Sequence, residues 1–277
     1  MTQLEVYKQK AADPDYFRNS GDGLLFACLQ AVATDKDFAI EEYIREDGQV
    51  FRNPAMAAGT HKLGPRESTI SRDMFTGLLC YCLHFKRLDI LETVWSYGWK
   101  HFWKMGQENQ IIQIPVWKWT LRIRNNRVYF TPGLIILLAA LIAHLRGRPK
   151  LATLLVNIWQ PLGTTPGYPS HLTMLHIYLN RRLRGETSSS EYNVLHDILK
   201  HSPCNALALA LFGAKRRARE ELLAQWPVDR LPTMEDWTEE WRTQRQDDDS
   251  GLVSGRPGDT RKHSGGDLLF VEHVLAL

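Results

Sequence analysis

Two short polar motifs stand directly before apolar stretches and carry the side chains best suited to chemistry. One is Ser71-Arg72-Asp73, and the other is His263-Ser264-Gly265-Gly266-Asp267. A carboxylate beside a guanidinium, and a histidine close to a carboxyl group, can hold the charge states that proton transfer needs. The motifs therefore nominate Asp73, Asp267 and His263 as general acid or base candidates.

Other charged groups precede the same kind of stretch. Asp22 lies between two glycines, which would let a ligand approach backbone N–H groups closely. Glu67 lies in the loop before the Ser71 motif, and cations that could bind an acidic group surround it: His61, Lys62, Arg66 and Arg72. Plainer interpretations stay open, because Asp22 and Asp73 could simply cap their helices and Glu67 could pair with Arg66 on the surface.

A repeated pattern positions these motifs. Six times a polar or glycine-rich lead precedes a nearly unbroken apolar run, at 24–33, 74–85, 134–145, 172–179, 206–213 and 268–277. Ser, Thr and Asp in the leads are good helix N-caps. A helix that is apolar on nearly all sides must be covered on nearly all sides. We therefore expect six buried inner helices.

More amphipathic segments lie between the apolar runs, at 37–45, 87–99, 149–159, 188–201 and 215–226. Short links between consecutive helices make antiparallel hairpins. Alternation of the two kinds predicts an all-α fold, an (α/α)6-type toroid of helical hairpins in one domain over 1–277. Residues 2–12 would form the outer helix that closes the ring. An open α-solenoid or an irregular bundle is the alternative.

Three long insertions interrupt the repeats, at 46–68, 104–130 and 227–262. Within the second, residues 110–129 alternate in polarity around Asn125-Asn126, which predicts a small β-hairpin or a long loop.

The alternating helices resemble the (α/α)-toroid carbohydrate-active enzymes, the glycoside hydrolases and polysaccharide lyases of that fold. The local carriers are the motif Ser71-Arg72-Asp73 with Gly77, and the motif from His263 to Phe270. The resemblance implies a polysaccharide or oligosaccharide substrate bound in a funnel where the inner helices begin. No particular family is assigned.

Two reactions fit that resemblance. A hydrolase needs two carboxyl groups across the scissile bond, drawn from Asp22, Glu67, Asp73 and Asp267. A lyase needs a His or Tyr base, such as His263, and a cation that neutralises a uronate. Aromatic rings can stack on sugars, which nominates Trp103, Trp117 and Trp119, although tryptophan also fills helix contacts. A non-catalytic helical module, such as a virion component, is the rival from another class.

Composition excludes other classes. The 277 residues carry a formal net charge of +3 with both signs interspersed, which does not indicate nucleic-acid binding. The four cysteines lack the spacing of a zinc or redox site, and we expect no metal and no cofactor. The longest apolar run, 133–145, is shorter than the ~20 residues that span a bilayer. Without a signal peptide, the expected location is the cytoplasm, with release by lysis or a place on a virus particle left open.

Overall fold

A computed structural model gives the fold and describes residues 23–61, 68–107, 110–116, 119–125, 128–158, 168–201, 203, 205–224 and 265–277. The chain is mainly helical, as the sequence predicts. Six helices form where the apolar runs lie: α2 (Gly23–Thr34), α4 (Arg72–His84), α6 (Pro132–Leu145), α8 (Tyr168–Arg184), α10 (Ala206–Phe212) and α13 (Gly265–Ala276). The expected helix at 2–12 lies outside the described residues.

Four amphipathic helices alternate with them, close to their expected bounds. They are α5 (Leu88–Lys100), α7 (Pro149–Ile158), α9 (Ser189–His201) and α11 (Lys215–Ala224). Helices α6 and α10 begin at side-chain caps, of which the sequence predicts the one at Thr131. The Thr131 and Asn205 side chains accept from the backbone N–H groups of Leu134 and Ala208, at the starts of α6 and α10.

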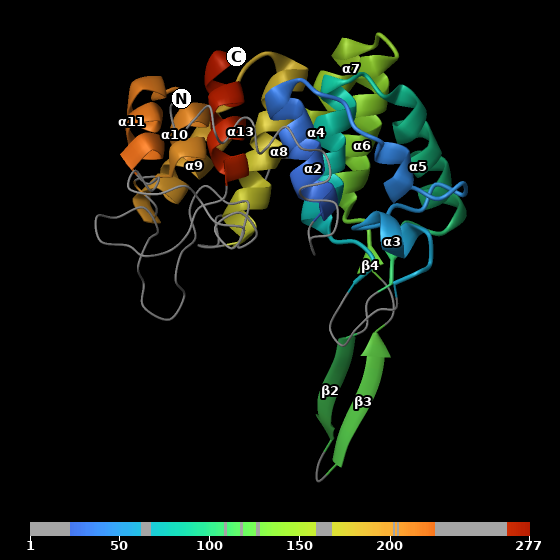
Figure 1. The fold of residues 1–277 in the computed structure, drawn as a ribbon. Helices are drawn as coiled ribbons and strands as arrows, with labels where there is room; N and C mark the ends of the chain where they lie inside the picture. Colours follow the sequence, from blue (N-terminus) through green and yellow to red (C-terminus); the bar gives the residue numbers. More distant parts are fainter. Residues whose placement is uncertain are drawn as a thin grey trace.

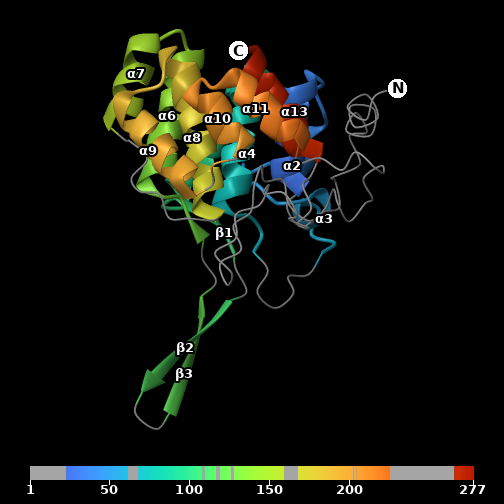
Figure 2. The same ribbon diagram turned by 90° about the vertical axis from the view of Figure 1, so that its left-hand side faces the viewer.

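The apolar helices contact one another in cyclic order. Contacts pass from α2 to α4, α6, α8, α10 and α13 in turn, and α13 contacts α2 again. Each amphipathic helix contacts the two apolar helices that flank it in sequence, and α4 also contacts α8 directly. Figures 1 and 2 show the apolar helices side by side, with α13 next to α2.

Helices α2 and α4 approach each other closely at Gly77. A Cβ atom on Gly77 would lie 2.8 Å from Leu25 Cδ1 and 3.1 Å from Leu25 Cα, so only glycine fits there. Gly77 belongs to the motif that begins at Ser71, and its role in the fold is to let two apolar helices touch.

The expected helix at 37–45 is wrong. Only a 3-10 turn, η1 (Ile40–Tyr43), forms there. The Tyr43 carbonyl accepts from the N–H of Phe51 rather than from a following helical turn, and Ile44 bridges to Val50. The segment buries Ile40 and Tyr43 by folding back on itself, which a longer helix would prevent. A short helix, α3 (Pro54–Ala57), follows it.

The insertion at 104–130 contains two antiparallel pairs of strands. Strand β1 (Lys104–Gly106) pairs with β4 (Val128–Tyr129), and β2 (Gln110–Val116) pairs with β3 (Trp119–Asn125). Figure 1 shows β2 and β3 projecting away from the helices. Of the two predictions for residues 110–129, the paired strands fit a β-hairpin rather than a long loop. Asn125 itself lies in β3, where it pairs with Gln110.

A buried ionic network joins α8 to α9. Glu191, at 0% exposure, accepts hydrogen bonds from Asn180 Nδ2 (3.0 Å) and from the backbone N–H of Ser188 (2.8 Å), and it forms an ion pair with Arg184. The Ser188 hydroxyl accepts from the Glu191 N–H at 3.3 Å, which completes a reciprocal capping box at the start of α9.

Candidate functional site

The candidates Arg72 and Asp73 lie at the end of the helical body where α4, α6 and α8 begin, which we call the lead end. In Figure 1 it is the lower side, where β4 leads into α6. Arg72, Asp73 and Thr76 come from the first turns of α4, and Thr76 contacts His176 of α8. The placement of Arg72 and Asp73 follows from sequence, because the leads are the N-terminal caps and first turns of helices that are otherwise apolar.

Asp73 occupies the first turn of α4. Its carboxylate accepts a hydrogen bond from the Ser71 hydroxyl, and the residue is 3% exposed. Ser71 is the N-cap residue of α4, but its hydroxyl donates to the Asp73 carboxylate and accepts no hydrogen bond from a backbone N–H of the helix. Asp73 is thus held in place beside the positive end of the helix dipole.

Thr76, one turn further along α4, reaches α8. Its hydroxyl donates to the Arg72 carbonyl oxygen (2.8 Å), and its Oγ1 atom lies 3.3 Å from Nε2 of His176. The single hydroxyl proton goes to Arg72, so we assign the Nε2 proton to His176, which donates it to Thr76. Nδ1 is then the atom of His176 that can accept a proton.

Electrostatics keep His176 neutral. Burial, and to a lesser extent the charge of the Arg72 guanidinium, together lower its pKa to about 4. Arg72 itself is exposed. The lead end therefore presents an exposed cation next to a neutral imidazole that comes from another helix. No sequence motif points to His176, because its partner Thr76 lies 100 residues away.

The structure does not bring the other candidates into this group. Asp22, Lys62, Arg66, Glu67, Trp117 and His263 lie outside the described residues. The backbones of Asp267 and Trp119 belong to α13 and β3, but their side chains are not among those described. His61 is exposed beyond α3.

Trp103 packs into the protein. Its ring lies 4.9 Å from Trp95 and 5.7 Å from Phe130, centroid to centroid, and a Cβ atom on Gly98 would meet it at 2.6 Å. Trp103 is partly buried against the core. This packing gives Trp103 a role in joining α5 to the strand insertion.

A second polar cluster lies at the opposite end. His84 Nε2 lies 2.9 Å from Asp35 Oδ1, the His84 and His273 rings are 5.5 Å apart, and His273 Nε2 lies 3.2 Å from the Tyr178 hydroxyl. Burial, followed by the His84 and Arg182 charges, lowers the pKa of His273 to about 4 against an opposing effect of Asp35. No sequence motif points to this cluster, because its four members come from widely separated segments.

Neither end contains a metal-type cluster. Across the described ranges no three His, Cys, Asp or Glu side chains gather as metal ligands would. Cys28, Cys80 and Cys82 are buried and free, as expected of small apolar side chains. Among the helices that the structure describes, none is both long and apolar enough to span a membrane.

Comparison with known proteins found no matching family model, no matching curated protein and no matching solved structure.

Proposed function

We propose that the cyclic order of helices is that of an (α/α)6 toroid and that its lead end acts on a glycan. Two observations support the toroid: α13 contacts α2, and each of the four amphipathic helices bridges two consecutive apolar helices. This arrangement would bring the polar leads together at one end, as the alternation of the sequence predicts.

Of the two glycan-cleaving reactions, the lyase fits the described side chains better. The observation that carries this choice is the neutral His176 beside the exposed Arg72. A uronate lyase removes the proton on the carbon next to the carboxylate and expels the glycosidic oxygen from the neighbouring carbon. It needs a cation that neutralises the carboxylate and a base that is free of its proton at neutral pH.

Arg72 would bind the uronate carboxylate, and Nδ1 of His176 would take the proton. Substrate binding would also help the base. Neutralising the Arg72 charge removes one of the two causes that depress the His176 pKa, so the imidazole becomes more basic when the substrate is in place. Asp73, fixed by Ser71, would position the first turn of α4 that carries Arg72.

The hydrolase remains the second enzymatic candidate, and it needs Asp73 paired with another carboxyl group about 5–10 Å away. One observation favours a non-catalytic module instead. Asp73 is 3% exposed and hydrogen-bonded to Ser71, as expected of a residue that only stabilises its helix.

A glycan-panel digestion separates the three functions. Wild type, Arg72→Gln, His176→Gln and Asp73→Asn are incubated with acidic and neutral glycans, and new reducing ends and the ultraviolet absorbance of unsaturated uronates are both followed. A lyase gives both signals on a uronate polymer and loses at least a hundredfold in rate in the His176 variant. Thermal unfolding of each variant shows whether a loss reflects folding.

Reducing ends without ultraviolet absorbance, abolished by Asp73→Asn, would establish the hydrolase and refute the lyase. Activity on no glycan in the panel would support the module. The matched control is Arg216→Gln, which removes an exposed arginine of α11 that lies on a different helix pair from the lead-end residues.

A further inference from the structure

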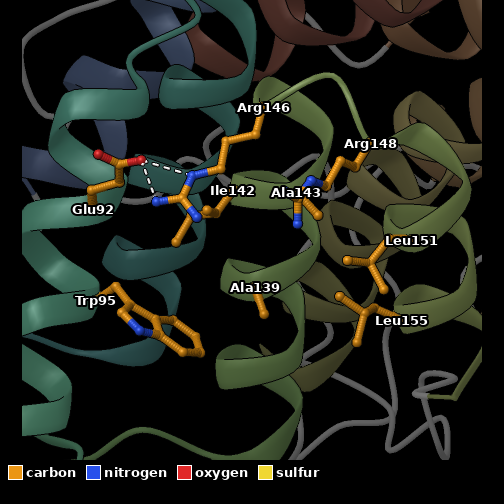
Figure 3. Close-up of a pocket in the computed structure, with 9 residues that line it drawn as sticks. All are labelled: Glu92, Trp95, Ala139, Ile142, Ala143, Arg146, Arg148, Leu151 and Leu155. Carbon is orange, nitrogen blue, oxygen red and sulfur yellow. Dashed lines mark hydrogen bonds and ion pairs between the residues drawn. The ribbon is translucent and has the colours of Figure 1, made fainter.

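A separate cavity lies on the outer side of the helices and belongs to neither polar cluster. It has a volume of about 360 Å³ and lies where α5 and α7 flank α6. This volume is within the range of roughly 300–1,000 Å³ that ligand pockets occupy. Figure 3 shows its lining side chains, with Trp95 on the α5 side and Leu151 and Leu155 on the α7 side.

The interior of this cavity is apolar. Ala139, Ile142 and Ala143 of α6 form its floor, and the small alanines leave the space between the two amphipathic helices unfilled. Leu151 is 41% exposed, although an amphipathic helix normally turns its leucines to the core. An apolar ligand would cover this surface and gain the free energy of burying it.

Positive charge is confined to one end. Arg146 and Arg148 line the cavity beside the turn between α6 and α7 (Figure 3). Arg146 is paired with Glu92, with Nη2 and Nε at 2.8 and 2.9 Å from the same carboxylate oxygen. Within the described part of the chain, Arg148 has no ion-pair partner. The pair with Glu92 is neutral, so Arg148 leaves a net positive charge at this end.

We infer that this cavity binds an amphiphilic carboxylate, with the aliphatic body between Trp95 and the α7 leucines and the carboxylate at Arg148. The charge distribution selects this occupant. A neutral apolar molecule would leave Arg148 unused, and a cationic amphiphile would be repelled. The inference is independent of the glycan proposal, because the cavity lies on the outer helices and shares no residue with the lead end.

The test measures binding of decanoate to the full chain by isothermal titration calorimetry below its micelle concentration, next to octanoate, decanol and decylammonium. Decanoate is expected to bind more tightly than octanoate by on the order of tenfold, as two further buried CH₂ groups predict. Decanol is expected to bind several-fold more weakly than decanoate, because it lacks the charge that pairs with Arg148. Decylammonium is expected to bind more weakly than decanol, because Arg148 repels it.

Two variants place the ligand. Arg148→Gln should abolish the preference for decanoate over decanol, while the matched control Arg216→Gln should leave it unchanged. Ala139→Phe fills the floor from a partly exposed position and should abolish binding of both molecules. Thermal unfolding checks that each variant is folded. If Ala139→Phe does not fold, Leu151→Gln replaces it as the blocking variant.

Three outcomes would overturn the inference. The first is no decanoate binding by a folded wild type. The second is equal affinity for decanoate, decanol and decylammonium, and the third is binding that a folded blocking variant leaves intact.

Discussion

Nε2 of His176 lies 3.3 Å from Oγ1 of Thr76, and this contact joins the middle of α8 to the first turns of α4. The Thr76 hydroxyl also donates to the Arg72 carbonyl oxygen, so one side chain connects the cation, the imidazole and the start of the helix. The contact fixes which nitrogen of His176 is protonated.

Replacing Thr76 by valine is expected to destabilise the protein by about 1–3 kcal/mol, because it leaves the partly buried Nε2–H of His176 without its acceptor at unchanged side-chain size. Thr76→Ser keeps the hydroxyl and is the matched control. Urea unfolding followed by circular dichroism measures both. Equal stability of the two variants would show that the contact contributes nothing.

Acid is expected to destabilise the fold through His176 and His273. Each has a folded-state pKa of about 4, below the ordinary histidine value of 6.5. Between about pH 6.5 and pH 4 the unfolded chain therefore binds protons that the folded chain refuses, so the free energy of unfolding falls as pH falls. Stability from these groups is complete above about pH 6.5.

Urea unfolding of wild type, His176→Gln and His273→Gln at several pH values across this window tests the assignment. Each variant should show a shallower loss of stability on acidification. Curves parallel to that of wild type would mean that other groups cause the acid sensitivity. His196→Gln, at an exposed position on α9, controls for the loss of a histidine as such.

Glu191 is expected to be the most costly ionisable residue to remove among those described. Glu191→Ala leaves the buried Arg184 charge unpaired and removes the acceptor of Asn180 and of the Ser188 N–H. Loss of one partner of a buried ion pair typically costs roughly 3–5 kcal/mol. The control Glu220→Ala breaks an exposed pair with Arg216 and should cost about 0.5 kcal/mol or less. Similar losses in both variants would contradict the buried network.

Gly77→Ala should destabilise the protein although alanine favours helices. Helix propensity alone predicts a gain of about 1 kcal/mol, but the added methyl group meets the Leu25 backbone at 3.1 Å and pushes α2 from α4. Overpacking of this kind costs about 1–3 kcal/mol. Ser96→Ala, at an exposed site on α5, controls for propensity. A Gly77 variant more stable than wild type would show that the two helices can separate without cost.

Much of the helical order was readable from sequence. Apolar runs preceded by caps located all six inner helices, because burial on every side leaves few polar positions along a helix. The Ser188-x-x-Glu191 capping box was also readable, though its link to Arg184 and Asn180 was not. Residues 37–45 have helical composition, yet their contact with Phe51 bends them into a turn.

The candidate site was predictable only in part. Motif spacing pointed to Asp73 and Arg72, both on one helix, since neighbours in a helix are also neighbours in sequence. Motif spacing could not identify His176. A histidine within an apolar run is interpreted as a core residue unless its partner on another helix is known. Nor could motif spacing show that Asp73 is buried, since burial depends on what packs over the helix start.

Because α13 packs against α2, the last described helix of the chain is a structural neighbour of the first. During synthesis α2 leaves the ribosome long before α13 is made. The apolar face of α2 that packs against α13 therefore stays uncovered until α13 has been synthesised. Contacts this distant in sequence slow folding and prolong exposure to aggregation. We would expect newly made chains to depend on chaperones until α13 has been made and can pack against α2.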